Sequence, residues 1–123
     1  MKRVYVFGNE YLPDDRMAVD IAACLGGVEI VKCTSPDDLL PDLLDEAVSQ
    51  ITILDVVKGI GKPMLIEDIA KLKVNSMVSL HDFDVGYFLN LAKEAGFGKN
   101  IKIIGVPAKG DAGKLAGEVK AWV

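Results

Sequence analysis

Three side chains in this sequence combine the types needed to hold a divalent cation. His81 is the only histidine of the chain, within the segment SLHDFDVGY at residues 79–87. Asp15 precedes an apolar stretch with helical periodicity, and Asp55 lies near the end of a short apolar run. Two carboxylates and an imidazole are hard or borderline ligands, and a set of three leaves coordination positions open for water or substrate. Asp15, Asp55 and His81 are therefore candidate metal ligands.

Short apolar runs alternate with helical segments along the chain. The runs RVYVFG, VEIVKC, ITILDVV and IKIIGV, at residues 3–8, 28–33, 51–57 and 101–106, are rich in β-branched residues, which is typical of buried strands. Apolar positions recur on one helical face over residues 17–25 and 85–95 and in the last segment after Asp111. Strands that alternate with helices require right-handed crossovers, so the sheet should be mostly parallel.

The expected fold class is α/β, in one domain over residues 1–123. We expect a three-layer sandwich, with a mostly parallel five-stranded sheet and helices on both faces. One antiparallel edge strand can be accommodated within MLIEDIAKL at residues 64–72, and SMVSL at residues 76–80 is a further strand candidate. Ser35 can cap a second helical segment, which Pro41 should divide into two short turns or kink.

The fold predicts where the candidate ligands meet. In open α/β sheets ligands bind outside the carboxyl ends of the strands. This edge receives Asp15 after the first strand, Cys33 after the second, Asp55 on the third and His81 beyond SMVSL. We expect Asp15 and His81 to be exposed loop residues whose replacement by Ala costs little stability. A purely structural interpretation also stands, in which Asp15, or its neighbour Asp14, caps the first helix, Asp55 ends a strand and His81 lies in a polar loop.

Other site chemistries have weaker signals. The first turn, GNEYLPDD, has no G-x-G-x-x-G pattern, and no P-loop occurs, which argues against a dinucleotide or nucleoside triphosphate. A flavin is compatible with the fold class, although an acidic first loop would repel its phosphate. A nucleophilic Cys33 assisted by His81 and Asp55 is conceivable, but no nucleophile signature surrounds Cys33.

Composition excludes several function classes. With 18 acidic and 14 basic residues the net charge is −4, so no nucleic-acid partner is expected. No apolar run approaches the roughly 20 residues that span a bilayer, and the amino terminus lacks signal-peptide features. We therefore expect a cytoplasmic protein without a membrane span. Its cysteines should be reduced, with Cys24 packed in a helix as a small hydrophobe.

The order of several segments resembles one enzyme family. VFGNEYLPDDRMAVDIAACL resembles the opening of the endopeptidases that mature nickel-iron hydrogenases, in which a strand leads to Gly-Asn, a short apolar stretch and a pair of acids. DDLLPDLLDEAVSQITILDVV resembles a helix with its Leu-Leu-Pro-x-Leu-Leu run and a strand that ends in an aspartate. SLHDFDVGYFLNLAKEAG resembles the histidine loop and the helix that follows it. The similarity covers nearly the whole chain.

The resemblance implies an activity and a ligand set. It implies a protease that removes the C-terminal extension from the precursor of a hydrogenase large subunit after nickel insertion, with the precursor's bound nickel as recognition signal. The positions that match the family's metal ligands are Asp15, Asp55 and His81, and the two acids are the catalytic candidates. Other divalent cations could occupy the same site. Cleavage would be hydrolysis by a polarised water, without an acyl-enzyme, by a monomer.

Departures from the family pattern define the alternatives. Arg16 and Ala18 stand where members usually have glycines, and Lys32 and Cys33 replace glycines of a Gly-Gly-Thr sequence after the second strand. After the last strand, GVPAKGD lacks an acid near Pro107. These changes would reshape the substrate cleft. The alternative function is a non-catalytic metal- or partner-binding hydrogenase assembly factor, and a third interpretation is a flavodoxin-like small-molecule binder.

Overall fold

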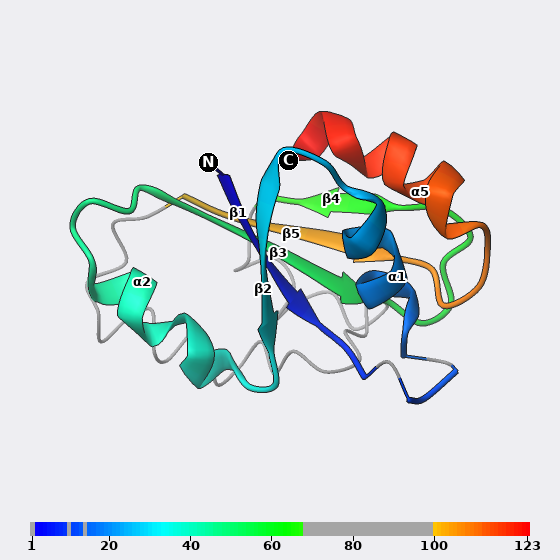
Figure 1. Cartoon of the computed structure of the whole chain (residues 1–123), viewed down its shortest axis with the longest axis horizontal. Coiled ribbons are helices and arrows are strands. Elements are labelled where there is room, and N and C mark those ends of the chain that lie inside the picture. The colour runs from blue at the N-terminus through cyan, green and yellow to red at the C-terminus, as the bar shows by residue number, and fades with distance from the viewer. Residues whose placement is uncertain (1, 10, 14, 68–99) are drawn as a thin grey trace.

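A five-stranded sheet organises the computed structural model, which describes residues 2–9, 11–13, 15–67 and 100–123 (Figure 1). The strands are β1 (Lys2–Phe7), β2 (Val28–Cys33), β3 (Gln50–Val56), β4 (Met64–Ile66) and β5 (Asn100–Val106). Their order is β2-β1-β3-β5-β4, and every pairing is parallel except that of β4 with β5. The predicted α/β class and its antiparallel edge strand are therefore confirmed.

Helices cover both faces of this sheet. On one face lie α1 (Met17–Cys24) and α5 (Ala112–Val119), which contact one another and are seen side by side in Figure 1. On the other face lie the 3-10 helix η1 (Pro36–Leu39) and α2 (Leu40–Leu44), whose Leu39 and Leu43 are buried. The 3-10 helix η2 (Lys120–Trp122) follows α5. The described residues thus form three layers, as expected.

Each face of the sheet contributes one apolar core. Val4, Leu54 and Ile104 pack with α1 and α5, whereas Ile53 and Ile103 pack with η1 and α2. This division follows from strand geometry, because successive side chains point to opposite faces. The central strand β3 is buried along its length after Gln50, which agrees with the prediction of a strand covered on both sides.

Local capping explains the shorter elements. Ser35 accepts a hydrogen bond from the backbone N–H of Asp37, and η1 ends where Pro41 enters the first turn of α2. The second helical segment is therefore two short pieces, one of the two predicted forms. Asp111 caps α5, the helix expected in the last segment, by accepting from the N–H of Lys114. Residues 76–80 and the predicted helix at 85–95 lie outside the described residues. None of the described helices has the length and apolar character that crossing a membrane requires.

Two expectations about α1 are wrong. Its N-cap is Arg16, and Asp15 does not cap it; the alternative cap, Asp14, is not among the described residues. Cys24 is exposed and is not packed as a small hydrophobe. It is the last residue of α1, and the next residue, Leu25, is extended and packs on the core in its place. A helical pattern fixes the face of a residue but not whether neighbouring elements reach that turn.

Candidate functional site at the carboxyl edge of the sheet

Asp15 is a buried carboxylate in the loop after β1. Its side chain is 1% exposed, and Oδ2 accepts a hydrogen bond of 3.0 Å from the backbone N–H of Asn9. The expectation that Asp15 is an exposed loop residue is therefore wrong. A carboxylate is stable in such a place only when polar groups compensate for lost water, and the N–H of Asn9 supplies part of that compensation. The same N–H also lies 3.2 Å from the carbonyl oxygen of Asp15.

The loop folds back on the strand it leaves because residue 8 is a glycine. Gly8 has a φ of +153°, and a Cβ atom there would lie 2.7 Å from the carbonyl oxygen of Asp15. Two further backbone hydrogen bonds close the loop, from Leu12 N–H to the carbonyl of Asn9 at 3.1 Å and from Asp15 N–H to the carbonyl of Leu12 at 3.0 Å. Glycine is the residue that tolerates both this φ and this contact. Gly8 therefore determines the position of Asp15.

Asp55 is the second buried carboxylate, with 0% exposure on β3. Strand alternation places it on the same face as Ile51 and Ile53, and its Oδ1 accepts a 2.8 Å hydrogen bond from the N–H of Val56. Its partner on β5 is Gly105, at which a Cβ atom would lie 2.5 Å from Cγ2 of Val57. A buried acid in a central strand costs stability, and such costs are retained mainly where the acid has a function.

The two acids belong to neighbouring strands at one edge of the sheet. β1 and β3 pair in parallel with Val6 opposite Leu54, so the carboxyl ends of both strands face the same way. Asp15 follows the carboxyl end of β1, and Asp55 lies within the carboxyl end of β3. His81, the predicted imidazole ligand, lies outside the described residues, and the three-residue site stays a prediction. Among the described residues alone, no group of three or more His, Cys, Asp or Glu side chains could hold a metal ion.

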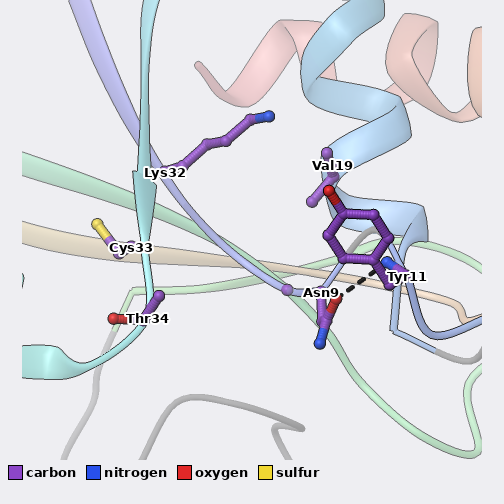
Figure 2. A pocket seen from close by; sticks show the side chains of 7 residues that line it. Asn9, Tyr11, Val19, Lys32, Cys33 and Thr34 are labelled. Atoms are coloured by element: carbon purple, nitrogen blue, oxygen red, sulfur yellow. Dashed lines mark hydrogen bonds between the residues drawn. The ribbon is translucent and has the colours of Figure 1, made fainter.

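Cys33 is unsuited to the nucleophilic role considered from the sequence. Its side chain is 3% exposed and belongs to the core beneath η1 and α2. Burial, with a smaller contribution from the negative charge of Asp38, raises the pKa of this thiol to about 12. A thiol, in contrast to a thiolate, is a poor nucleophile and metal ligand. Figure 2 shows its Sγ pointing away from Asn9 and Tyr11.

A groove of about 490 Å³ lies between the loop after β1 and the end of β2 (Figure 2). We call it the Tyr11–Lys32 groove. Its described lining residues come from β1 and its loop, from α1 and from β2; they are Gly8, Asn9, Tyr11, Val19, Lys32, Cys33 and Thr34. Sequence reasoning placed Cys33 at this edge but gave Tyr11 no role. The exposed fraction of Tyr11 is 85%, a property that no pattern in its segment predicts.

The far wall of the groove is held by Asp38, a residue with no role in the sequence-based site. Its Oδ2 accepts hydrogen bonds from the N–H of Thr34 at 2.8 Å and of Ser35 at 3.3 Å. These bonds, to Thr34 first and then to Ser35, lower the pKa of Asp38. The capping role of Asp38 could have been recognised in the sequence, because Ser35 and Asp38 have the Ser-x-x-Asp spacing of a capping box. The carboxylate of Asp38 therefore fixes the turn after β2. In the same way, the carboxylate of Asp15 fixes the turn after β1.

Comparison with known proteins gives a result only at the level of structure. No family model and no curated protein sequence matches this chain. The structure is similar to the NiFe hydrogenase maturation protease HybD from Thermococcus kodakarensis, with a TM-score of 0.68 and 18% identity over 99% of this chain and 95% of that chain. It is also similar to the NiFe hydrogenase maturation protease HycI from Thermococcus kodakarensis KOD1, with a TM-score of 0.63 and 18% identity over 98% and 90% of the two chains.

A third solved structure, an uncharacterized protein from Wolinella succinogenes, has a TM-score of 0.58 and 14% identity over 98% of this chain and 92% of that chain. All three matches span nearly the full length of both partners, so the similarity concerns the whole domain. The resemblance noted from the sequence segments is thereby supported at the level of the fold. This protein has the fold of the NiFe hydrogenase maturation proteases.

Proposed function

We propose that this protein is an endopeptidase that removes the C-terminal extension of a nickel-iron hydrogenase large-subunit precursor after nickel insertion. The observation that carries the proposal is the pair of buried carboxylates, Asp15 and Asp55, at the carboxyl edge of neighbouring strands in a fold shared with HybD and HycI. A fold alone hosts many activities, so the assignment depends on these side chains. We further propose that the protein acts as a monomer in the cytoplasm.

The chemistry available at this edge is hydrolysis directed by carboxylates. The nickel ion belongs to the precursor and is part of the substrate. Asp15 and Asp55 supply oxygen ligands, and His81 supplies the imidazole of the proposed recognition set; other divalent cations could be bound by the same donors. The Asn9 N–H fixes the orientation of the Asp15 carboxylate, and a carboxylate held in place can act as the general base toward a water. The resemblance to the maturation endopeptidases implies water as the attacking group, without an acyl-enzyme.

A cleavage assay tests the proposal. The nickel-loaded and nickel-free forms of the large-subunit precursors encoded in the same genome are incubated with the protein, and loss of the C-terminal peptide is followed by intact mass. We expect cleavage of a nickel-loaded precursor only. If a loaded precursor is bound but never cleaved, the protein is instead a non-catalytic assembly factor. If no precursor is bound or cleaved, the assignment to hydrogenase maturation is wrong.

A further inference from the structure

We propose that the outer edge of β2 binds the precursor polypeptide as an added strand of the sheet, through an extended segment next to the cleavage point. The inference rests on the proposed function and deepens it, because it states how the substrate chain is held beside the acids. The binding is carried by backbone groups of β2 and by the grooves along that strand. It requires no charged side chain of this protein.

β2 is the terminal strand of the sheet and pairs, among the described strands, with β1 alone (Figure 1). In a parallel ladder alternate residues direct their N–H and C=O groups to opposite sides, so half of these groups in β2 point away from β1. The register with β1 is continuous from Val28 to Cys33, without a bulge, and the strand contains no proline. Edge strands that resist pairing are commonly short, bulged or interrupted by proline. β2 is long and regular enough to accept another strand.

The two charged side chains of β2 are directed toward neighbouring elements. Glu29 accepts a 2.7 Å hydrogen bond from Nε of Arg3 on β1. Lys32 also has a partner within the chain, and Figure 2 shows its side chain extending toward α1 and Val19. Between them, Ile30 and Val31 are partly exposed. The charges therefore do not block the hydrogen-bonding edge of the strand.

The spacing of the outward backbone groups selects an extended polypeptide. Successive residues that face the same side of a strand are about 6.6 Å apart, and each offers one donor and one acceptor. An ion or a small molecule can match one such position, whereas a second strand matches all of them in register. In this mode of recognition the main-chain hydrogen bonds give affinity, and pockets for alternate side chains give specificity.

Two grooves along β2 supply pockets for alternate side chains. The Tyr11–Lys32 groove lies at the carboxyl end of the strand, and a second groove of about 370 Å³ lies between β2 and α1. Ile30 and Lys32 line the second groove from one face of β2, and Val19 and Ala23 line it from α1. Val19 and Lys32 line both grooves, so the two are neighbours. Every second side chain of an added strand points to this face.

The register of the sheet brings one end of the added strand to the carboxyl edge. Phe7, the last residue of β1, is opposite Cys33, the last residue of β2, so the two strands end level. Adjacent strands are about 4.8 Å apart, which places an added strand about 14 Å from β3. About four extended residues span that distance. A cleavage point a few residues from the paired segment can therefore reach the carboxyl end of β3, where Asp55 lies.

Steady-state cleavage of the nickel-loaded precursor by Ala23→Arg tests the grooves. Ala23 is exposed on α1 and lines the second groove, so an arginine there takes space that the substrate side chains need. We expect KM to rise about tenfold while kcat stays within about twofold, because the acids are unchanged. The matched control is Cys24→Arg, which adds the same side chain at the next, exposed position, outside the described lining of both grooves. Its KM should stay within about twofold of the parent value.

Backbone hydrogen exchange tests the strand pairing itself. Exchange rates of the β2 amides are measured by NMR with and without the nickel-loaded precursor, in Asp55→Asn so that the precursor stays uncut. We expect alternate amides between Val28 and Cys33 to exchange about tenfold more slowly in the complex, because only the outward N–H groups gain a partner. A general stabilisation of the protein by binding would slow neighbouring amides alike.

The outcomes separate this inference from the proposed function. An unchanged KM in Ala23→Arg, or a bound precursor that leaves the alternate β2 amides unprotected, overturns the inference. Normal cleavage by the parent protein then leaves the proposed function intact. Failure of the parent protein to bind or cleave any precursor overturns both.

Discussion

The backbone N–H of Asn9 donates to Oδ2 of Asp15 across the turn that follows β1, at 3.0 Å. This bond joins Asn9, one of the residues that line the Tyr11–Lys32 groove, to a carboxylate that is 1% exposed. It also explains why Asp15 is not a helix cap, because its side chain is directed back toward the strand and α1 begins after Arg16. The position of Asp15 thus depends on the loop as a whole, and its consequences can be tested.

Replacement of Gly8 should disturb this loop more than any other part of the fold. A Cβ at Gly8 would lie 2.7 Å from the carbonyl oxygen of Asp15, at a φ of +153° that L residues rarely adopt. We expect Gly8→Ala to lower the free energy of unfolding by about 1–3 kcal/mol, measured by urea denaturation. Gly117→Ala is the control, because Gly117 lies in α5 with nothing within 4 Å of the added atom. It should stabilise the protein by about 0.5–1 kcal/mol. Equal changes in the free energy of unfolding for Gly8→Ala and Gly117→Ala would contradict the role of Gly8 in this loop.

The two acids can be neutralised without changing their shape. In Asp15→Asn and Asp55→Asn an amide oxygen can still accept from the N–H of Asn9 or Val56, so the fold should persist. Removing a buried charge relieves its desolvation cost, so we expect a melting temperature equal to or above that of the parent. Cleavage of the nickel-loaded precursor should fall by about a hundredfold or more.

Glu118→Gln is the matched control for the acid variants, because Glu118 is an exposed carboxylate on α5. Its cleavage rate should equal that of the parent. Full activity in both Asp15→Asn and Asp55→Asn would remove these residues from the mechanism. A lowered melting temperature in parallel with lost activity would indicate a structural role instead.

The two cysteines should differ sharply in reactivity. Cys24 is exposed, whereas Cys33 is 3% exposed with a pKa raised to about 12 by burial and by the charge of Asp38. In the native protein at pH 8 we expect one thiol to react rapidly with Ellman's reagent and the second only after denaturation. Cys24→Ser should eliminate the rapid phase. Loss of the rapid phase in Cys33→Ser instead, in a folded protein, would show that Cys33 is accessible.

The raised pKa of Cys33 also makes a prediction at high pH. Because the folded state holds this proton more tightly than the unfolded state, its contribution to stability is complete below the ordinary thiol pKa of 9.0 and is lost as the pH rises toward about 12. Urea midpoints should therefore fall over that interval. A Cys33→Ala variant should show a smaller fall over the same interval.

Asp38 should titrate at lower pH than an ordinary aspartate. The hydrogen bonds from the N–H groups of Thr34 and Ser35 favour its charged form and lower its pKa below 3.8. The stabilisation is therefore present above pH 3.8 and is lost as the pH falls through the lowered pKa. In NMR spectra the amide signals of Thr34 and Ser35 should shift together in that acidic interval. Asp38→Asn should abolish their shared transition, and a transition at or above pH 3.8 would contradict the assignment.

Much of the scaffold was predictable because it depends on local patterns. The apolar runs identified β1, β2, β3 and β5, and the run MLI within residues 64–72 identified the antiparallel edge strand β4. Ser35, Pro41 and Asp111 act at helix ends as their residue types indicate. Asp55 was recognised because an acid inside an apolar strand is unusual. The roles of His81 and of the segment around it stay predictions from sequence.

Only the tertiary structure decided the environment of the loop residues. Asp15 is buried because Gly8 lets the chain return to β1, and Cys24 is exposed because α1 ends at that residue. Cys33 is a protonated core thiol because η1 and α2 pack over it, and Tyr11 and Lys32 share a groove although 21 positions separate them. Periodicity determines which face of an element a residue occupies. Burial, hydrogen bonding and pKa depend on which distant segments pack against that face, and that information is carried by the fold.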